Sequence, residues 1–398
     1  MVSMATASLG PAYRRLWSAT ALANLGDGIR QAALPLLTVT VTTDPMLVAG
    51  VTVAGQLPWL LFGLAAGAIV DRVDRRRLVA VVDIVRVSLL AVLVAAVAAD
   101  VVGLVLIYLV AFGCGIGETL RDTAASTLLP ALVHRDELDR ANGKLINAEI
   151  AGNELVGPPL GSYLAGIALV VPFAVNGGTL AVAVVLILAL PHLFTPRTAP
   201  GRARILAETG AGLRWLAGHR RLRTLVGLTS VFVFVDSAWF AILVLYVTQV
   251  LTLPAAGYGL MLAVGAVGGL TGGALAARVG RVLGPGRTLA GALLVAAAGQ
   301  VLLGATSSTP FTVAGLVLGS FAFGVWNVIS VTQRQKLTPE DMLGRVTSTA
   351  RTITMVASLV GALVGGVVAG ALGLHAAVLL GVPLLLAAAV VSVVTFRD

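Results

Sequence analysis

Twelve apolar runs, each long enough to cross a lipid bilayer as a helix, follow one another along this chain. A helix of about twenty residues spans the ~30 Å of hydrocarbon in a bilayer. The runs cover residues 14–40, 46–70, 78–98, 102–128, 142–167, 171–191, 222–250, 256–278, 287–305, 311–333, 345–370 and 374–395. Because a backbone in lipid must satisfy its own hydrogen bonds, these runs predict an all-α membrane protein.

The composition supports a chain that is covered by lipid. Of its 398 residues, 58% are hydrophobic and only 11% are charged, whereas a soluble domain carries roughly 25% charged residues. The 46 glycines suit close helix packing in a membrane. A single cysteine, Cys114, and four scattered histidines offer no disulfide or metal cluster, so we expect no metal and no cofactor.

The basic residues predict the orientation of the chain. Apart from Arg30, Arg86, Arg121 and Arg351, they fall at the N-terminus, at the C-terminus or in the even-numbered connections between runs. By the positive-inside rule, both termini are then cytoplasmic, and we expect a multi-pass protein of the bacterial inner (cell) membrane. The positive-inside rule thus accounts for the net charge of +9, and we expect no nucleic-acid partner.

The two halves of the chain resemble each other. The end of the second run, from Gly67 to Arg75, corresponds to the end of the eighth, from Gly273 to Arg281. We therefore predict an N-terminal six-helix bundle in 1–191, a cytoplasmic linker in 192–221 with a short amphipathic helix around 205–216, and a C-terminal six-helix bundle in 222–398. Parallel repeats of this kind are related by a pseudo-two-fold axis along the membrane normal, with the substrate site between them.

A motif after the second run carries a family resemblance. The segment Gly67–Arg77 resembles the major facilitator signature G-x-x-x-D-R/K-x-G-R-R/K, and it matches at Gly67, Asp71, Arg72, Arg75 and Arg76. Asp74 stands where the family has glycine. The resemblance implies the major facilitator fold and a transport function. It also implies a gating role for the matching residues, with Asp71 latching the halves through the N-terminal dipole of the eleventh helix.

A second motif lies in the fifth run. The segment Asn153–Ser162 resembles the antiporter motif G-x-x-x-G-P-x-x-G-G of drug and proton exchangers, and it keeps Gly157, Pro158 and Gly161. The alternative is an ordinary packing kink, since a proline removes a backbone hydrogen bond. The loop Leu132–Gly143 is also similar to that of siderophore and macrolide exporters. The R-x-x-Q-G motif of many proton-coupled exporters is absent, which leaves the coupling ion open.

Ionisable residues inside the runs are candidates for function, because they are costly in a membrane. They are Asp27, Arg30, Asp83, Arg86, Glu118, Arg121, Asp122, Glu149 and Glu154. Three acid–arginine pairs have i,i+3 spacing, namely 27/30, 83/86 and 118/121, so their charges can neutralise each other on one helix face. We predict that Asp27, Glu118 and Asp122 couple protons and that Asn24, Asp27, Arg30, Gln31, Glu118 and Arg121 contact substrate. A purely structural role is the alternative, above all for Asp83 with Arg86.

The second half is aromatic instead of charged within its runs. Phe232, Asp236, Trp239 and Phe240 form one helical stripe, and Phe323, Trp326 and Asn327 form another. In the major facilitator superfamily the helices concerned line the central cavity, so the resemblance makes these residues substrate contacts. Packing is the alternative.

These features together predict a secondary active transporter and not an enzyme. We expect a monomer that exports amphipathic small molecules, such as drugs, antibiotics or siderophores, by alternating access and proton antiport. An importer or facilitator of the same fold is one alternative. A non-transporting membrane receptor or scaffold is another, although the short loops offer little docking surface.

Overall fold

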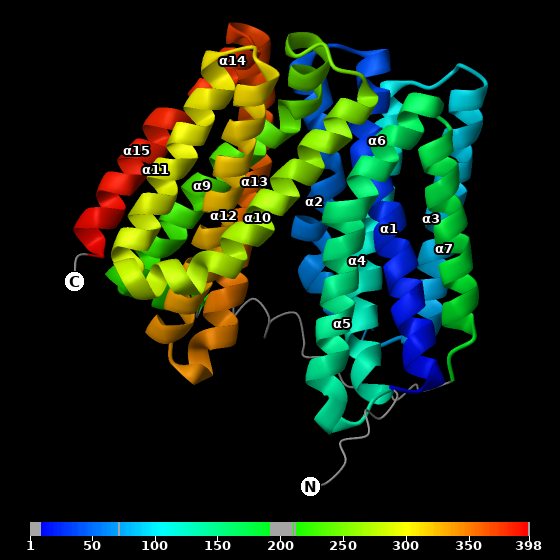
Figure 1. Cartoon of the computed structure of the whole chain (residues 1–398). Coiled ribbons are helices and arrows are strands. Elements are labelled where there is room, and N and C mark those ends of the chain that lie inside the picture. The colour runs from blue at the N-terminus through cyan, green and yellow to red at the C-terminus, as the bar shows by residue number, and fades with distance from the viewer. Residues whose placement is uncertain (1–8, 71, 192–209, 211, 397–398) are drawn as a thin grey trace, which may run out of the picture. The chain divides into compact units, whose positions relative to one another are not determined.

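The computed structural model describes residues 9–70, 72–191, 210 and 212–396, and every regular element within them is a helix (Figure 1). The helices are α1 (Gly10–Val41), α2 (Pro45–Val70), α3 (Arg75–Ala98), α4 (Leu104–Leu128), η1 (Leu129–Ala131), η2 (Arg135–Glu137), α5 (Leu138–Ile150), η3 (Ala151–Val156), α6 (Gly157–Ile167), α7 (Val171–Leu188), α9 (Arg220–Leu245), η4 (Tyr246–Val250), α10 (Ala255–Leu283), α11 (Pro285–Ala305), α12 (Thr309–Leu337), α13 (Glu340–Leu372), α14 (Leu374–Leu379) and α15 (Gly381–Thr395).

Consecutive helices join into twelve long segments in the described part of the chain, at the places that the apolar runs predict. Four segments are composite: α4–η1, η2–α5–η3–α6, α9–η4 and α14–α15. Ten segments are long and apolar enough to cross a membrane by length and composition alone. The other two, α1 and η2–α5–η3–α6, carry several of the charged residues, which lower their mean hydropathy. The prediction of an all-α membrane protein with twelve transmembrane helices is confirmed.

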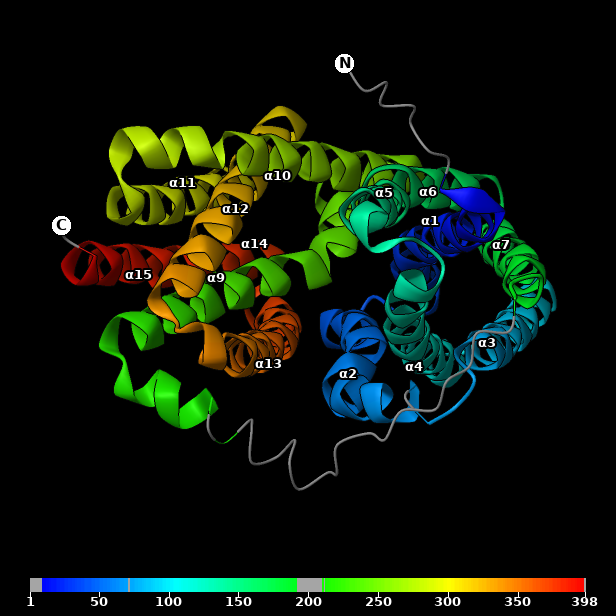
Figure 2. The same cartoon turned by 90° about the horizontal axis from the view of Figure 1, so that it is seen from below.

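By their contacts, the helices fall into two units. One unit comprises Met1–Leu34 and Leu61–Ala199, and the other comprises Pro35–Leu60 and Pro200–Asp398. In the first unit α3 packs against both α4 and α7 (Figure 2). In the second, α12 packs against α10 and α11, and α13 packs against α9. Most of the linker predicted at 192–221 lies outside the described residues, so the predicted domain boundaries stay predictions.

Small residues allow the helices of the second unit to approach closely. A Cβ atom on Gly299 of α11 would lie 2.7 Å from the carbonyl oxygen of Gly315 on α12. A Cβ on Gly365 of α13 would lie 2.7 Å from the Cα of Ala238 on α9. Contacts of this length leave no room for a larger side chain, which is how membrane helices pack without a hydrophobic driving force.

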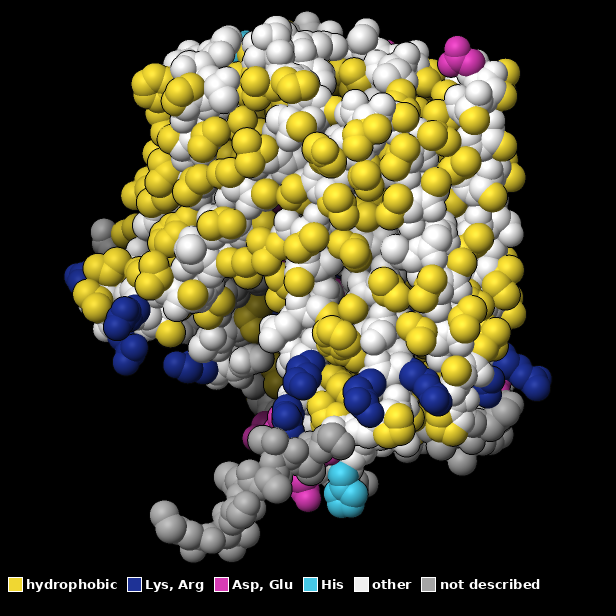
Figure 3. Space-filling view, turned by 45° about the vertical axis from the view of Figure 1, so that its right-hand side comes forward, with side chains coloured by type: hydrophobic (Ala, Val, Ile, Leu, Met, Phe, Trp, Pro, Cys, Tyr) yellow, Lys and Arg dark blue, Asp and Glu magenta, His cyan; other side chains and the backbone are white. Residues whose placement is uncertain are grey.

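The surface combines apolar flanks with basic helix ends. Figure 3 shows hydrophobic side chains over the flanks of the helices and Lys and Arg side chains gathered at one end. Along the chain, the basic residues stand where α3, α9, α11 and α13 begin and where α10 and α12 end. This alternation follows the predicted topology. Together with the ten apolar helices, it is the pattern of a protein that spans the membrane many times.

Candidate functional site

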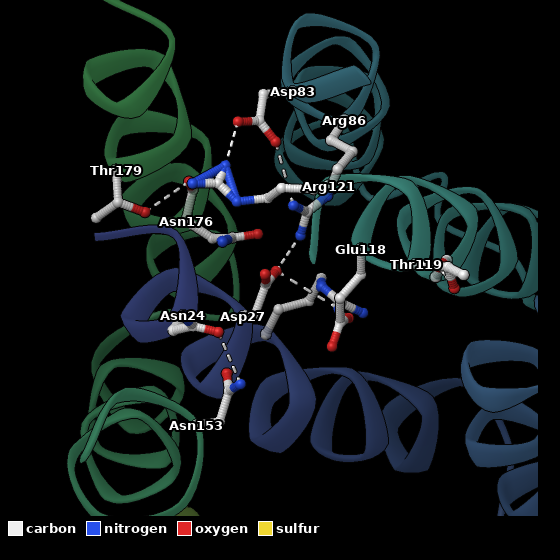
Figure 4. A network of polar contacts seen from close by, with 12 residues as sticks. Asn24, Asp27, Asp83, Arg86, Glu118, Thr119, Arg121, Asn153, Asn176 and Thr179 are labelled. Carbon is white, nitrogen blue, oxygen red and sulfur yellow. Dashed lines mark hydrogen bonds and ion pairs between the residues drawn. The ribbon is translucent and has the colours of Figure 1, made fainter. Parts of the chain in front are cut away.

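A chain of alternating buried charges links three helices of the first unit (Figure 4). It starts at Glu118 on α4, whose Oε2 lies 3.0 Å from Nη2 of Arg30 on α1. The same nitrogen lies 3.6 Å from Oδ1 of Asp27, one turn away on α1. Asp27 also pairs with Arg86 of α3. The chain therefore passes from α4 through α1 to α3.

The second part of the chain returns from α3 to α4. Arg86 Nη1 lies 3.4 Å from Oδ1 of Asp83 on the same helix, and Asp83 also pairs with Arg121 of α4. Arg121 ends the chain by donating a hydrogen bond of 2.9 Å to the carbonyl oxygen of Ala19 on α1. Three acids and three arginines thus alternate, and their charges sum to zero.

Burial sets the members of this network apart. Five of the six are nearly inaccessible to solvent: Asp27, Arg30, Asp83, Arg86 and Arg121. The Glu118 side chain is 16% exposed and is the one acid of the network with a single ion-pair partner. An uncompensated charge at such depth is very costly. The two inner acids of the chain, Asp27 and Asp83, therefore each need both of the arginines that they contact. Glu118 is the accessible end of the chain.

The i,i+3 spacing predicts two of the three same-helix pairs. Asp27 with Arg30 and Asp83 with Arg86 are in contact as expected. The expected pairing of Glu118 with Arg121 is wrong, because each bonds to a residue of another helix. Figure 4 shows Glu118 and Arg121 reaching different parts of the network.

The α1 helix packs backbone to backbone against the segment that resembles the antiporter motif. A Cβ on Gly28 would lie 3.0 Å from the Cα of Asn153 and 3.1 Å from the Cα of Gly157. A Cβ on Gly161 would lie 2.8 Å from the Cα of Ile29. The glycines of both helices therefore permit this approach directly beside Asp27 and Arg30.

The same segment contains a π-helical turn. The amide of Gly157 bonds to the carbonyl oxygen of Gly152, five residues earlier, at the end of η3. Pro158 follows, and since it has no amide hydrogen it cannot continue the regular α-helical bonds. Such turns occur often at functional sites. Within this π-helical segment, Asn153 Nδ2 donates a hydrogen bond of 2.9 Å to Oδ1 of Asn24 on α1.

The signature after α2 is described except for Asp71, which lies outside the described residues. Asp74, which replaces the usual glycine, caps α3 by accepting a hydrogen bond of 3.2 Å from the amide of Arg77. Arg75 Nη1 donates a hydrogen bond of 3.4 Å to the carbonyl oxygen of Thr127. Arg76 donates a hydrogen bond to the carbonyl oxygen of Leu188. These arginines thereby join the start of α3 to the ends of α4 and α7. The gating role of the motif stays a prediction.

The aromatic side chains of the second unit form two clusters. The Phe232 ring of α9 meets the rings of Phe323 and Trp326 on α12 edge to face, with centroids 5.4 and 5.7 Å away. Trp326 donates a hydrogen bond of 3.2 Å from Nε1 to Oγ1 of Thr229. Further along α9, Trp239 lies edge to face with Tyr246 at 5.2 Å.

Accessibility differs among the residues predicted to contact substrate. In the second unit Phe232, Trp239 and Trp326 are buried, Asp236, Phe240 and Phe323 are half-buried, and Asn327 is exposed. In the first unit, Gln31 is exposed and Asp122 is half-buried. The half-buried and exposed members offer surface to a ligand, whereas the buried rings support them. Their contact with substrate stays a prediction.

Comparison with known proteins identifies the family. The profile of the family described as transmembrane secretion effector, a branch of the major facilitator superfamily, matches residues 5–397. The chain belongs to this family. A comparison with curated protein sequences finds no match.

Solved transporters share the fold of this secretion-effector chain. A bacterial homologue of the iron transporter ferroportin, in an inward-facing state, has a TM-score of 0.76 at 18% identity, covering 97% of this chain and 99% of that one. A nucleoside transporter has a TM-score of 0.76 at 11% identity, covering 98% and 100%. A bacterial homologue of the human lysosomal transporter Spinster has 0.76 at 14% identity, covering 97% and 96%. At these identities the likeness shows the fold alone.

Family and fold together make the chain a multi-pass membrane transporter of the major facilitator type. The predicted superfamily is confirmed. The finer predictions, of an exporter driven by protons in the inner membrane, are taken up below as proposals.

Sequence analysis missed some contacts and residues of interest. Asp83 and Arg86 pair with each other as expected, but they also bridge Asp27 to Arg121 in the middle of the network. In the second unit, Ser358 of α13 bonds to both Ser237 of α9, at 2.7 Å, and Gln56 of α2, at 3.2 Å. Isolated serines and glutamines in apolar runs give too weak a signal to be singled out.

Proposed function

We propose that this transporter exports amphipathic small molecules by alternating access and that proton entry drives the export. The observation that carries the proposal is the six-membered charge network of α1, α3 and α4. Six buried charges are costly to place in a membrane, and a proton-driven carrier needs acids whose partners can change.

Arg30 is placed to act as the switch of the network. Its Nη2 faces Glu118 at 3.0 Å and Asp27 at 3.6 Å, so one cationic group serves two acids. Protonation of Glu118 weakens its hold on Arg30 and favours Arg30 with Asp27. Asp122 lies one turn after Glu118 on α4 and is the third candidate for a proton.

The contacts of α1 connect this switch to a moving part of the fold. Gly28, in the turn between Asp27 and Arg30, touches the π-helical segment η3 and Gly157. A change in the partner of Arg30 therefore acts on a helix contact that tolerates no added atom. The resemblance of 153–162 to the antiporter motif and the family description, secretion, both favour export over import.

In the proposed orientation, the protein lies in the inner membrane of a bacterial cell and both of its termini lie in the cytoplasm. The basic residues at alternating helix ends support this placement. The aromatic, half-buried surface of the second unit suits the apolar part of an amphipathic substrate.

The proposal is tested by transport in proteoliposomes. Purified protein is reconstituted, and the uptake of ethidium, erythromycin and chloramphenicol is followed with and without an imposed pH gradient. We expect wild-type protein to move at least one of these compounds uphill when the gradient is present. Asp27→Asn should abolish uphill movement while keeping exchange of labelled for unlabelled compound across the membrane.

A matched control is Asp139→Asn, which removes an exposed acid from the first turn of α5 and should behave as wild type. If Asp27→Asn still pumps uphill at the wild-type rate, Asp27 is structural and Glu118→Gln or Asp122→Asn is tested next. If the wild-type protein equilibrates these compounds but never concentrates them, the protein is a facilitator and the coupling proposal is wrong.

A further inference from the structure

Asp236 is a carboxylate without a counter-charge. It lies in the middle of α9 and is half-buried. In the part of the chain that the structure describes, its side chain has no ion pair and no hydrogen bond. An ionised carboxylate in an apolar setting is too costly to leave unpaired, so the Asp236 carboxyl is either protonated or held by water or a cation at its oxygens.

The basic residues that the structure describes in the second unit do not supply that cation. Those that the structure describes lie in the first or last two turns of the helices or between helices, with Arg351 of α13 as the exception. The Arg351 guanidinium lies 5.5 Å from the ring centre of Trp59. The six charges of the first unit neutralise one another and leave none over. Asp236 therefore differs from Asp27 and Asp83, which are each held by two arginines.

Aromatic residues flank Asp236 along α9. It follows Phe232 by one turn of α9 and precedes Phe240 by another, so the three share one helix face. The Phe232 ring supports that of the half-buried Phe323 at 5.4 Å. A carboxylate beside aromatic rings is the environment that recognises an organic cation, through the charge and through cation–π contact.

We propose that Asp236 is the binding site for the positively charged group of the substrate, and that the substrate class is lipophilic organic cations. This inference rests on the proposed function, since it names the class of compound that is exported. The apolar parts of the compound lie against Phe240 and Phe323. The Asp236 carboxylate takes the place of the water that would otherwise solvate the positive charge of the compound.

Tetraphenylphosphonium and tetraphenylborate test the proposal, because these probes share size and shape and differ in the sign of their charge. Equilibrium binding of each is measured with purified wild-type protein in detergent. We expect tetraphenylphosphonium to bind and tetraphenylborate to bind at least tenfold more weakly, since tenfold corresponds to about 1.4 kcal/mol. Asp236→Asn should weaken phosphonium binding by about tenfold or more, and Asp236→Glu should retain most of it.

Asp139→Asn is the matched control, because it removes one exposed acid elsewhere, in the first turn of α5, and should leave both affinities unchanged. Each variant is checked for a monodisperse elution profile and for wild-type helix content. A folded Asp236→Asn that binds tetraphenylphosphonium as wild type does would overturn the proposal, as would a wild type that binds both probes equally or neither.

The two proposals fail separately. Uphill export of chloramphenicol, a neutral compound, by a protein that binds no tetraphenylphosphonium would overturn the cation site and leave proton-driven export standing. Binding of tetraphenylphosphonium that depends on Asp236, in a protein that shows no response to a pH gradient, would support the cation site and refute proton coupling.

Discussion

The position of an acid within the charge network should decide how much stability it contributes. Asp83 lies at an inner position, is fully buried and holds both Arg86, at 3.4 Å, and Arg121. Glu118 lies at the end, holds Arg30 alone and is 16% exposed. Asp83→Asn should therefore destabilise the fold much more than Glu118→Gln, although each change removes one negative charge.

The magnitudes follow from the number of partners and from burial. Removing one partner of a buried ion pair costs about 3–5 kcal/mol of folding free energy. Asp83→Asn removes the carboxylate that two buried arginines share. Removing Glu118 affects one partly exposed pair, for which we expect about 1–2 kcal/mol, between the buried and surface values. At about 2 °C per kcal/mol for a chain of this size, Tm should fall by about 6–10 °C for Asp83→Asn and about 2–4 °C for Glu118→Gln.

The assay is thermal unfolding of the purified proteins in one detergent, with Asp139→Asn as the control for loss of an exposed acid. The double variant Asp83→Asn, Arg121→Gln completes a cycle. It should lose less than the sum of the single changes, because the stranded arginine is also removed. Equal Tm values for Asp83→Asn and Glu118→Gln would refute the distinction between inner and end positions.

Three further predictions concern packing, gating and the aromatic surface. Gly28→Ala places a methyl group against the backbone of η3 and should cost about 1–3 kcal/mol and slow transport, whereas Gly178→Ala, where the structure leaves open space, should be neutral in Tm and transport rate. Asp71→Asn should impair transport in proteoliposomes while expression stays at the wild-type level, and an unimpaired rate would exclude the latch that the signature implies. Trp326→Ala should weaken substrate binding more than Phe62→Ala does, because it removes support from the aromatic surface; equal effects in a binding assay would assign Trp326 to packing alone.

Much of the architecture follows from the sequence, because membrane helices are specified locally. Twenty apolar residues in a row span the bilayer whatever their neighbours are, and the basic residues between them mark alternate ends of the helices. The pairs of Asp27 with Arg30 and of Asp83 with Arg86 are also local, since i,i+3 spacing places both side chains on one face. Pro158 likewise marks the site of the irregular turn before the structure shows that the turn is π-helical.

The tertiary structure decided which helices share their charges. Spacing along α4 predicts that Glu118 and Arg121 lie on one face. In the structure, however, Glu118 pairs with Arg30 of α1, and Arg121 pairs with Asp83 of α3. No sequence period specifies that approach, because it depends on how α1, α3 and α4 pack and on the glycines that bring α1 against η3. Asp236 shows the converse: within the described residues it has no counter-charge, and that depends on which side chains the other helices place near it and not on its own helix. Local sequence thus places each charged group on a helix, and only packing selects its partner.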